Sequence, residues 1–433
     1  MTPQSNFMIL AIVTPSRDAE LRSLLEEMNH EPGVVNPGNT LVPFGQFERV
    51  HFARFVILED QTLDDIRVYG LPRVNLPTYL AFLGDMDGSV EDFFAELVHK
   101  AGDGLRRIFM HCDGFASGID LLSWIKEHNV APGANYVNWT GRTVCQVREE
   151  SALRNALIRF VENSGDSMRR MAPAGIRDRL KTFVAGEVQA GRLALTPPAP
   201  TPFMWQLRNL INLVGMPLLL LILSPLLLLA LPFVVILLRI AEKSDAVIAP
   251  RVDPDHARLL ASIEDHDVTN QFSAMGSVKP GLFRRMVMIG VLAAIDYTAR
   301  HIFNRGRLAR VISIQFARWV FLDGKRRVYF ASNYDGSLES YMDDFINKVA
   351  FGLNVVFSNG IGYPQTNWLV LNGAKDEQTF KDYLRRHQLP TQVWYNAFPG
   401  LTALDKWRNA LIREGIERSS MTDGEIREWL RLI

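Results

Sequence analysis

The chain has 433 residues, and its 47 Lys and Arg residues equal its 47 Asp and Glu residues, so its formal net charge is zero. This length accommodates two or three domains, each large enough to bury its own hydrophobic core. The balanced charge argues against nucleic-acid binding, because no overall positive field attracts a polyanion. The two cysteines, Cys112 and Cys145, fit neither a disulfide framework nor zinc-ligand spacing, so we expect no metal site.

The first part of the chain shows a clear alternation of strand and helix patterns. A short apolar run with no basic residues before it indicates a strand rather than a signal peptide. A helix begins at Ser16 or Asp18, and Ser89 caps a second helix whose first turn is acidic. The expected strands cover residues 7–13, 51–58, 79–83 and 107–112. The order βαββαβ is that of a ferredoxin-like unit.

A long apolar segment follows a proline-rich spacer at residues 195–202. Residues 209–238 carry no charge, and this uncharged stretch is longer than the roughly 20 residues that cross a bilayer. We therefore divide the chain into a first domain (1–165), a helical and proline-rich linker (166–208), a membrane segment (209–240) and a second domain with C-terminal helices (241–433).

The path of the membrane segment is left open by its three prolines, Pro217, Pro225 and Pro232. Each proline removes a backbone donor and disturbs the preceding turn, so a straight helix is not expected. A hairpin bent near Ser224 and a kinked helix both fit, and the basic residues on the two flanks show no clear asymmetry.

The second half of the chain repeats the first. Residues 50–58, VHFARFVIL, match residues 314–322, IQFARWVFL, and Asp87-Gly88-Ser89 matches Asp335-Gly336-Ser337 in the same order. Such self-similarity indicates a duplication. The corresponding expected elements are strands at 268–278, 311–322, 327–332 and 367–371, and helices at 280–303 and 337–350.

These patterns predict an α+β protein in which two tandem ferredoxin-like (βαββαβ) repeats form a pseudo-dimeric α+β barrel, with the apolar helical segment embedded in a membrane between them. A barrel of this kind encloses a cavity that can hold a ligand. Because the halves pair through their sheets, both must lie on the same side of the membrane, which we expect to be the cytoplasmic side. This favours a hairpin or in-plane segment over a single span.

Two repeated pairs of charged residues are the candidate site. Arg54 and Arg318 lie mid-strand on an apolar face, where a cation needs a partner. The turn aspartates Asp87 and Asp335 end the neighbouring strands, so we expect the pairs Arg54–Asp87 and Arg318–Asp335. Their presence in both halves favours a structural role over a ligand-facing one.

Residues 84–88, Gly-Asp-Met-Asp-Gly, resemble the GxxDG motif of dye-decolourising (Dyp-type) peroxidases. The resemblance implies tandem ferredoxin-like domains, haem, and Asp87 as an acid–base group. Of the histidines in the second half, His301 is the best candidate haem ligand, although a helix-end position also explains it. The F-A-R-W-V and S-N-Y-D-G segments also resemble a family of bacterial proteins that implies no activity.

The leading functional prediction is a membrane-associated protein whose barrel cavity binds an apolar or haem-like ligand; if the protein is an enzyme, the expected activity is that of a haem-dependent, peroxidase-like oxidoreductase. The alternative is a non-enzymatic membrane-surface scaffold, or an accessory protein that presents lipid substrate to a partner enzyme. The expected partners are membrane lipid, an apolar small molecule, and a second copy or partner enzyme, with no nucleic acid.

Overall fold

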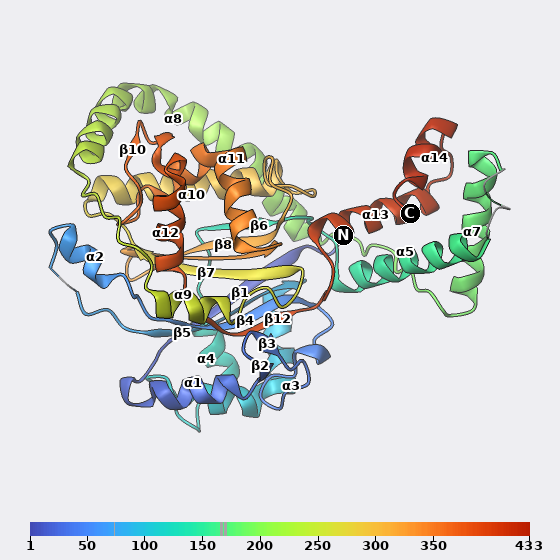
Figure 1. Cartoon of the computed structure of the whole chain (residues 1–433), viewed down its shortest axis with the longest axis horizontal. Helices are drawn as coiled ribbons and strands as arrows, with labels where there is room; N and C mark the ends of the chain where they lie inside the picture. Colours follow the sequence, from blue (N-terminus) through green and yellow to red (C-terminus); the bar gives the residue numbers. More distant parts are fainter. Residues whose placement is uncertain (73, 165–167, 169–170) are drawn as a thin grey trace.

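The computed structural model describes residues 1–433 except 73, 165–167 and 169–170. It is a mixed α+β protein with two four-stranded antiparallel sheets that lie face to face, each covered by helices on its outer side (Figure 1). Within the described residues the sheets do not close into a barrel, because the edge strands of one sheet do not pair with those of the other. The predicted boundary between residues 165 and 166 lies outside the described residues.

The first sheet has the order β1-β5-β4-β12, and all neighbours are antiparallel. Helices α1, α3 and α4 cover its outer face with a core rich in phenylalanine. Ser89 caps α3 by accepting a hydrogen bond from the Asp92 amide, as predicted. The bounds are β1 Gln4–Ile12, β4 Val50–Leu58, β5 Tyr79–Asp87, β12 Thr391–Asn396, α1 Asp18–Glu26, α3 Val90–Phe109 and α4 Leu121–Glu127.

The second sheet has the order β6-β8-β9-β7 and is also antiparallel throughout. Helices α10, α11 and α12 cover its outer face. The expected helix at 280–303 is confirmed, whereas that at 337–350 is longer than expected and has a non-helical residue, Val349. The bounds are β6 Ala134–Val137, β7 Thr269–Ser277, β8 Ile314–Leu322, β9 Arg327–Asp335, α10 Leu282–His301, α11 Leu338–Phe357 and α12 Glu377–His387.

The fourth strand of each sheet comes from the other half of the chain. β12 pairs with β4, and β6 pairs with β8. The predicted fourth strands are therefore wrong: residues 107–109 end α3, and residues 366–372 form the small β10-β11 hairpin. In each half the last strand, β6 after α4 and β12 after α12, joins the sheet of the other half, which local sequence patterns do not reveal.

An apolar layer joins the inner faces of the two sheets. It combines side chains of β4 and β5 with side chains of β8 and β9 and is almost completely shielded from solvent. Period-2 alternation gives every central strand one face toward its helices and one toward the other sheet. The layer consists of Met8, Val56, Leu58, Ala81, Leu83, Met275, Val320, Leu322, Tyr329, Ala331 and Leu389.

Helix α8 (Phe203–Ser244) is one continuous helix of 42 residues that contains all three prolines. It curves over the outer side of the second half in Figure 1, so the hairpin alternative is wrong and the bent-helix alternative holds. Near its start, the Leu213 carbonyl accepts from the Tyr297 hydroxyl at 3.1 Å. Near its end, buried Glu242 accepts from the Leu369 amide at 2.6 Å. Both ends of the curved helix are therefore held by the second half.

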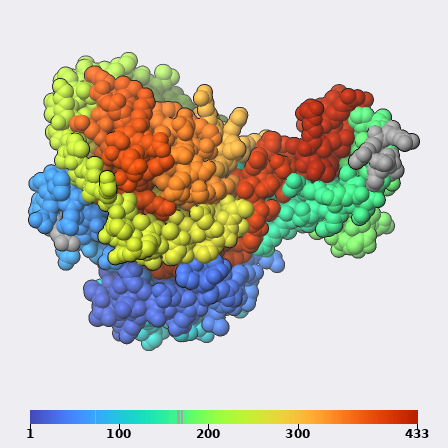
Figure 2. Space-filling view, in the orientation of Figure 1, coloured from blue at the N-terminus to red at the C-terminus, as the bar shows by residue number. Residues whose placement is uncertain are grey.

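Four helices of the described residues form an arm that projects to the right of the body in Figures 1 and 2. They share a separate apolar core, in which Leu153, Leu180 and Trp429 are buried. Their bounds are α5 Val144–Ser164, α7 Pro173–Gln189, α13 Ala403–Glu417 and α14 Asp423–Leu430. The other elements of the described residues are α2 Leu63–Val68, α9 Pro254–Ala261, β2 Asn29–Glu31, β3 Val34–Val35, β10 Thr366–Asn367, β11 Leu371–Asn372 and short 3-10 helices at Pro15–Arg17, Phe44–Gln46 and Gly373–Lys375.

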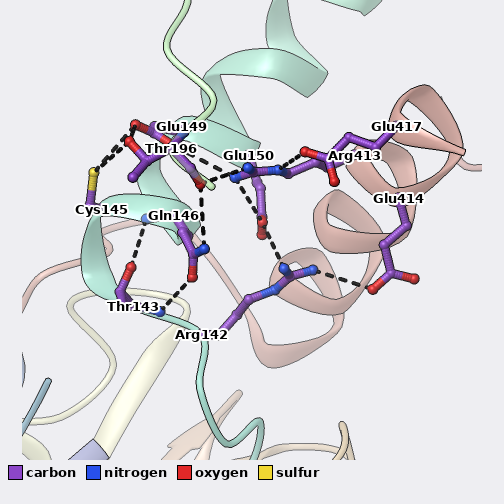
Figure 3. A network of polar contacts seen from close by, with 10 residues as sticks. All are labelled: Arg142, Thr143, Cys145, Gln146, Glu149, Glu150, Thr196, Arg413, Glu414 and Glu417. Atoms are coloured by element: carbon purple, nitrogen blue, oxygen red, sulfur yellow. Dashed lines mark hydrogen bonds and ion pairs between the residues drawn. The ribbon is translucent and has the colours of Figure 1, made fainter. Parts of the chain in front are cut away.

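A polar network joins α5 to α13 at the base of the arm (Figure 3). Glu150 is 1 % exposed and lies between Arg142, at 3.2 Å, and Arg413, at 3.7 Å. Neither of its carboxylate oxygens accepts a hydrogen bond from a described residue. Burial raises the pKa of Glu150 to about 7, against the partial opposing effect of the two arginines.

This carboxyl should make the stability of the protein pH-dependent. The pKa of Glu150 is about 7 in the fold against 4.5 for the free group, so its contribution is complete below pH 4.5 and is lost as the pH rises through 7. We expect the unfolding temperature of the wild type to fall across this window relative to Glu150→Gln. The control Glu162→Gln, on an exposed position of the same helix, should retain the wild-type profile. Parallel profiles for the wild type and Glu150→Gln would contradict this assignment.

Candidate functional site

The two repeated arginines cross the interface between the sheets. Arg318 of β8 donates to the carbonyls of Phe7, at 2.7 Å, and Gly84, at 2.8 Å, and pairs with the Asp85 carboxylate. Its side chain is 3 % exposed. A guanidinium has five N–H donors, and Arg318 uses three of them to bind two strands of the opposite sheet.

Arg54 of β4 makes the matching contacts in the other direction. It donates to the carbonyls of Phe272 and Ser332, each at 2.9 Å, and to the side chain of Asn333. Asn333 thus takes the place that Asp85 has in the first half. Arg54 consequently lacks a directly paired carboxylate, and burial lowers its pKa.

The predicted pairs Arg54–Asp87 and Arg318–Asp335 are therefore wrong. Arg54 lies opposite Leu83 in the β4–β5 register, so Asp87 is four residues farther along β5, about 13 Å away at the usual strand rise. Both arginines reach across to the other sheet instead of along their own. Asp85, which sequence reasoning passed over, provides the buried carboxylate for Arg318.

The turn aspartates accept hydrogen bonds from the first backbone amides of two arm helices, α5 and α13. Asp87 accepts from the Val144 amide at 2.8 Å and contacts His51 at 2.8 Å. Asp335 likewise accepts from the Ala403 amide at 2.7 Å and from Gln315 at 2.6 Å. Carboxylates are stabilising at helix N-termini, where amides lack intrahelical acceptors.

Lysine 406 lies beside the second of these aspartates. Lys406 donates to Gln315 and lies over the Phe398 ring, with Nζ at 3.9 Å from its centroid. Burial lowers the pKa of Lys406 to about 7 and raises that of Asp335 to about 6. The cavity beside them measures about 40 Å³, which leaves space for water but not for an organic substrate.

His301 lies at the end of α10, where its Nε2 contacts the Asn212 side chain at 2.8 Å. Asn212 belongs to α8, so this histidine helps to hold the apolar helix against the body. The helix-end position considered from the sequence is the one observed. Burial lowers the pKa of His301, which favours the neutral ring.

A large apolar cavity lies between the outer face of the second sheet and helices α10 and α11. Its volume is about 350 Å³, within the usual range for small-molecule sites. Phe272, Trp319 and Phe330 form its floor, while α11 and the loop after α10 form its walls. Of the described lining residues, only Thr298, Trp319 and Tyr341 carry a polar side-chain atom.

The corresponding space in the first half is filled by aromatic rings. Phe7 packs against Phe82 at 5.1 Å and Phe93 at 5.0 Å between ring centroids. Phe44 and Phe47, on the connection between α1 and β4, close this core from outside. The matching connection in the second half, residues 302–313, instead lines the rim of the cavity through Phe303, Leu308 and Ala309. The first half is therefore filled where the second half has a cavity.

The residues around this cavity do not fit haem. His301 does not line it, and the described lining residues include no histidine, cysteine or arginine to ligate iron or to pair with propionates. Asp87, the implied acid–base group, lies at the other sheet with both oxygens occupied. The residues expected from the peroxidase resemblance are thus not brought together.

Comparisons with known proteins add little. No family model matches the chain, and none of the curated proteins matches it. One similar solved structure is named "Putative monooxygenase", from Fusobacterium nucleatum subsp. nucleatum; it is 8% identical, the match covers 93% of this chain and 97% of that chain, and the TM-score is 0.29. A likeness at this level carries no argument about function, and the resemblance to Dyp-type peroxidases is not shown.

Removing one crossing arginine should destabilise the protein strongly. Arg318→Met leaves Asp85 as a buried carboxylate without its cation, and breaking a buried pair typically costs about 3–5 kcal/mol. The double variant Arg318→Met/Asp85→Asn should recover part of this loss, because the unpaired charge is gone. Urea unfolding followed by tryptophan fluorescence measures both.

An exposed arginine provides the control. Arg427→Met, on α14, should change the free energy of unfolding by less than about 0.5 kcal/mol. If Arg318→Met is as stable as this control, the crossing arginine does not hold the sheets together.

Proposed function

We propose that this protein lies on a membrane surface and binds an apolar ligand in the cavity beneath α10 and α11. The carrying observation is the cavity of about 350 Å³, whose lining is almost entirely apolar. It belongs to the half that also holds both ends of α8. An apolar pocket with a few polar groups is the usual form of a site for an apolar small molecule.

Helix α8 supports membrane attachment. Within the described ranges it is the helix long and apolar enough to cross a membrane, with a mean hydropathy of 2.9 over its best window. None of that window is buried in the protein, and Leu221 and Leu229 are 69% and 70% exposed. A contiguous apolar surface of this extent is unfavourable in water and marks a membrane or partner interface.

The contacts at the two ends of α8 favour an in-plane or shallow position over a straight span. Both ends bind residues of the second half, at Tyr297 and at Leu369. Arg239 lies over the Trp368 ring at 4.4 Å near the second end, and tryptophan and arginine are typical of the membrane–water boundary. Both folded halves then lie on one side, which we place at the cytoplasmic face.

The finer description of the fold belongs to this proposal. The matched segments around Arg54 and Arg318, and the matched helix caps of Asp87 and Asp335, support two tandem ferredoxin-like units that have exchanged their last strands. In this interpretation aromatic side chains fill the core of the first unit, whereas the second unit has kept an open cavity for a ligand.

The cavity chemistry favours binding and presentation over catalysis. Its described lining contains no carboxylate, histidine, lysine or thiol, the hydroxyl of its Tyr341 is hydrogen-bonded to Ser332, and the buried Lys406 and Asp335 lie elsewhere. General acid–base or redox chemistry needs such a group, or a cofactor, within reach of the ligand. An accessory role, in which the protein presents a lipid to a partner enzyme, is therefore preferred to a peroxidase-like reaction.

The membrane part of the proposal is tested by fractionation. The intact protein should sediment with membranes and resist extraction with high salt and carbonate, because α8 buries many leucines in lipid. Release by detergent alone is the expected result. Recovery of the intact protein in the high-speed supernatant would contradict membrane attachment.

The cavity is tested by filling it. Gly352 lines the cavity, and a Cβ at this position meets no atom within 4 Å, so Gly352→Trp places a ring there without a backbone clash. Labelling by a long-chain alcohol that carries a photoreactive diazirine should map to α11 and fall at least about tenfold in this variant.

Gly186→Trp is the matched control, because this glycine of α7 is also open and lies far from the cavity on the arm. It should label like the wild type. Equal labelling of α11 in Gly352→Trp and Gly186→Trp would show that the probe does not enter the cavity.

A further inference from the structure

A strongly basic loop forms part of the cavity rim. Residues 300–310, which we call the basic loop, contain Arg300, Arg305, Arg307 and Arg310, all of them exposed. Arg300 is partly neutralised by Asp296 at 3.1 Å. For the other three, no ion pair is formed within the part of the chain that the structure describes.

The basic loop also supplies apolar side chains to the cavity. Phe303, Leu308 and Ala309 line its wall and are partly exposed, and Arg305, Arg307 and Arg310 lie between or beside them in the sequence. On α11, Phe351 lines the same cavity and is 62% exposed, so it belongs to the rim. One short segment therefore presents an apolar wall and a cationic edge.

Acidic side chains near the opening do not cancel this charge. Asp343 and Asp344 of α11 are paired with Lys381, at 2.6 Å, and Lys348, at 2.7 Å. The rim consequently keeps the positive charge of Arg305, Arg307 and Arg310. Guanidinium groups bind carboxylates and phosphates through paired hydrogen bonds.

The cavity interior cannot accept a charged group, because burying an unpaired charge is very unfavourable. A ligand with one apolar and one ionised end must therefore leave its ionised end at the rim. From this combination we infer that the ligand is an anionic amphiphile: its chain fills the cavity, and the arginines of the basic loop bind its carboxylate or phosphate head. This inference rests on the proposed apolar ligand site and adds the charge of the ligand.

The position of the loop also indicates the source of the ligand. The basic loop begins at the end of α10, where His301 contacts Asn212 of the apolar helix α8. The rim is thus adjacent to the segment that would enter the membrane. A lipid leaving the bilayer at α8 would meet the arginines before its chain entered the cavity.

The experiment compares two probes with the same chain. A diazirine-bearing fatty acid and its methyl ester are added to the full-length protein in phosphatidylcholine vesicles, and labelled peptides of α11 are quantified after irradiation. Exposed ion pairs contribute modestly, so three arginines should give the carboxylate about a tenfold lower half-saturating concentration than the ester. This preference should shrink as the salt concentration rises.

Two variants separate this inference from the proposed function. Arg305→Gln/Arg307→Gln/Arg310→Gln should abolish the preference for the carboxylate and leave ester labelling unchanged. Arg67→Gln/Arg251→Gln/Arg427→Gln, which removes the same charge at exposed positions elsewhere, should retain it. Equal labelling by both probes in the wild type, or a preference that survives the first variant, would overturn the anionic head.

If neither probe labels α11 of the wild type, the result would instead contradict the proposed ligand site in the cavity. Competition by unlabelled lipid distinguishes the two sources of the head group. If phosphatidic acid displaces the probe, the ligand is a phospholipid. If oleate displaces the probe and phosphatidic acid does not, the ligand is a free fatty acid. If neither anion competes better than phosphatidylcholine, the inference is contradicted.

Discussion

The reciprocal crossing of Arg54 and Arg318 between the two sheets is the constraint on which the rest of the structure depends. Each guanidinium leaves a central strand and binds backbone carbonyls in the opposite sheet. A buried cation is tolerated only where its donors are satisfied, so this arrangement fixes the register in which the sheets face each other. The apolar layer around the arginines then excludes water from the interface.

The two crossings are similar but not equal. Arg318 has the carboxylate of Asp85, whereas the side chains that accept from Arg54 are the neutral ones of Asn333 and Ser273, so the two arginines share one paired carboxylate among the described residues. Together with the exchange of β6 and β12, the crossings join the halves into one body. A body of this kind cannot be divided between two compartments, and the curved α8, held at both ends, is consistent with that limit.

Much of this organisation was visible in the sequence. The α+β class, most of the strands and helices, and the uncharged apolar segment follow from periodicity and composition. The fourth strands were misplaced because strand exchange depends on contacts between halves, and residues 391–396 resemble an ordinary local strand. The partners of Arg54 and Arg318 were missed because period-2 alternation gives the face of a side chain but not the sheet that it meets.

The large apolar cavity of the second half was not predictable in the same way. Phe272, Phe330 and Tyr341 read as core residues, and only packing shows that the second half lacks the plug that Phe44 and Phe47 provide in the first. The run of arginines at 300–310 was a usable signal, since the second half carries it and the first half has no such run between its first helix and its second strand.

The most direct test of this account is to find on which side of the membrane the two ends of α8 lie. Gln206→Cys and Ser244→Cys, each in a Cys145→Ala background that leaves only buried Cys112, place single exposed thiols beside the two ends of the helix. A membrane-impermeant maleimide added to sealed vesicles of known orientation should modify both thiols from the cytoplasmic face. Modification of the two thiols from opposite faces would contradict a single body that lies on one side of the membrane.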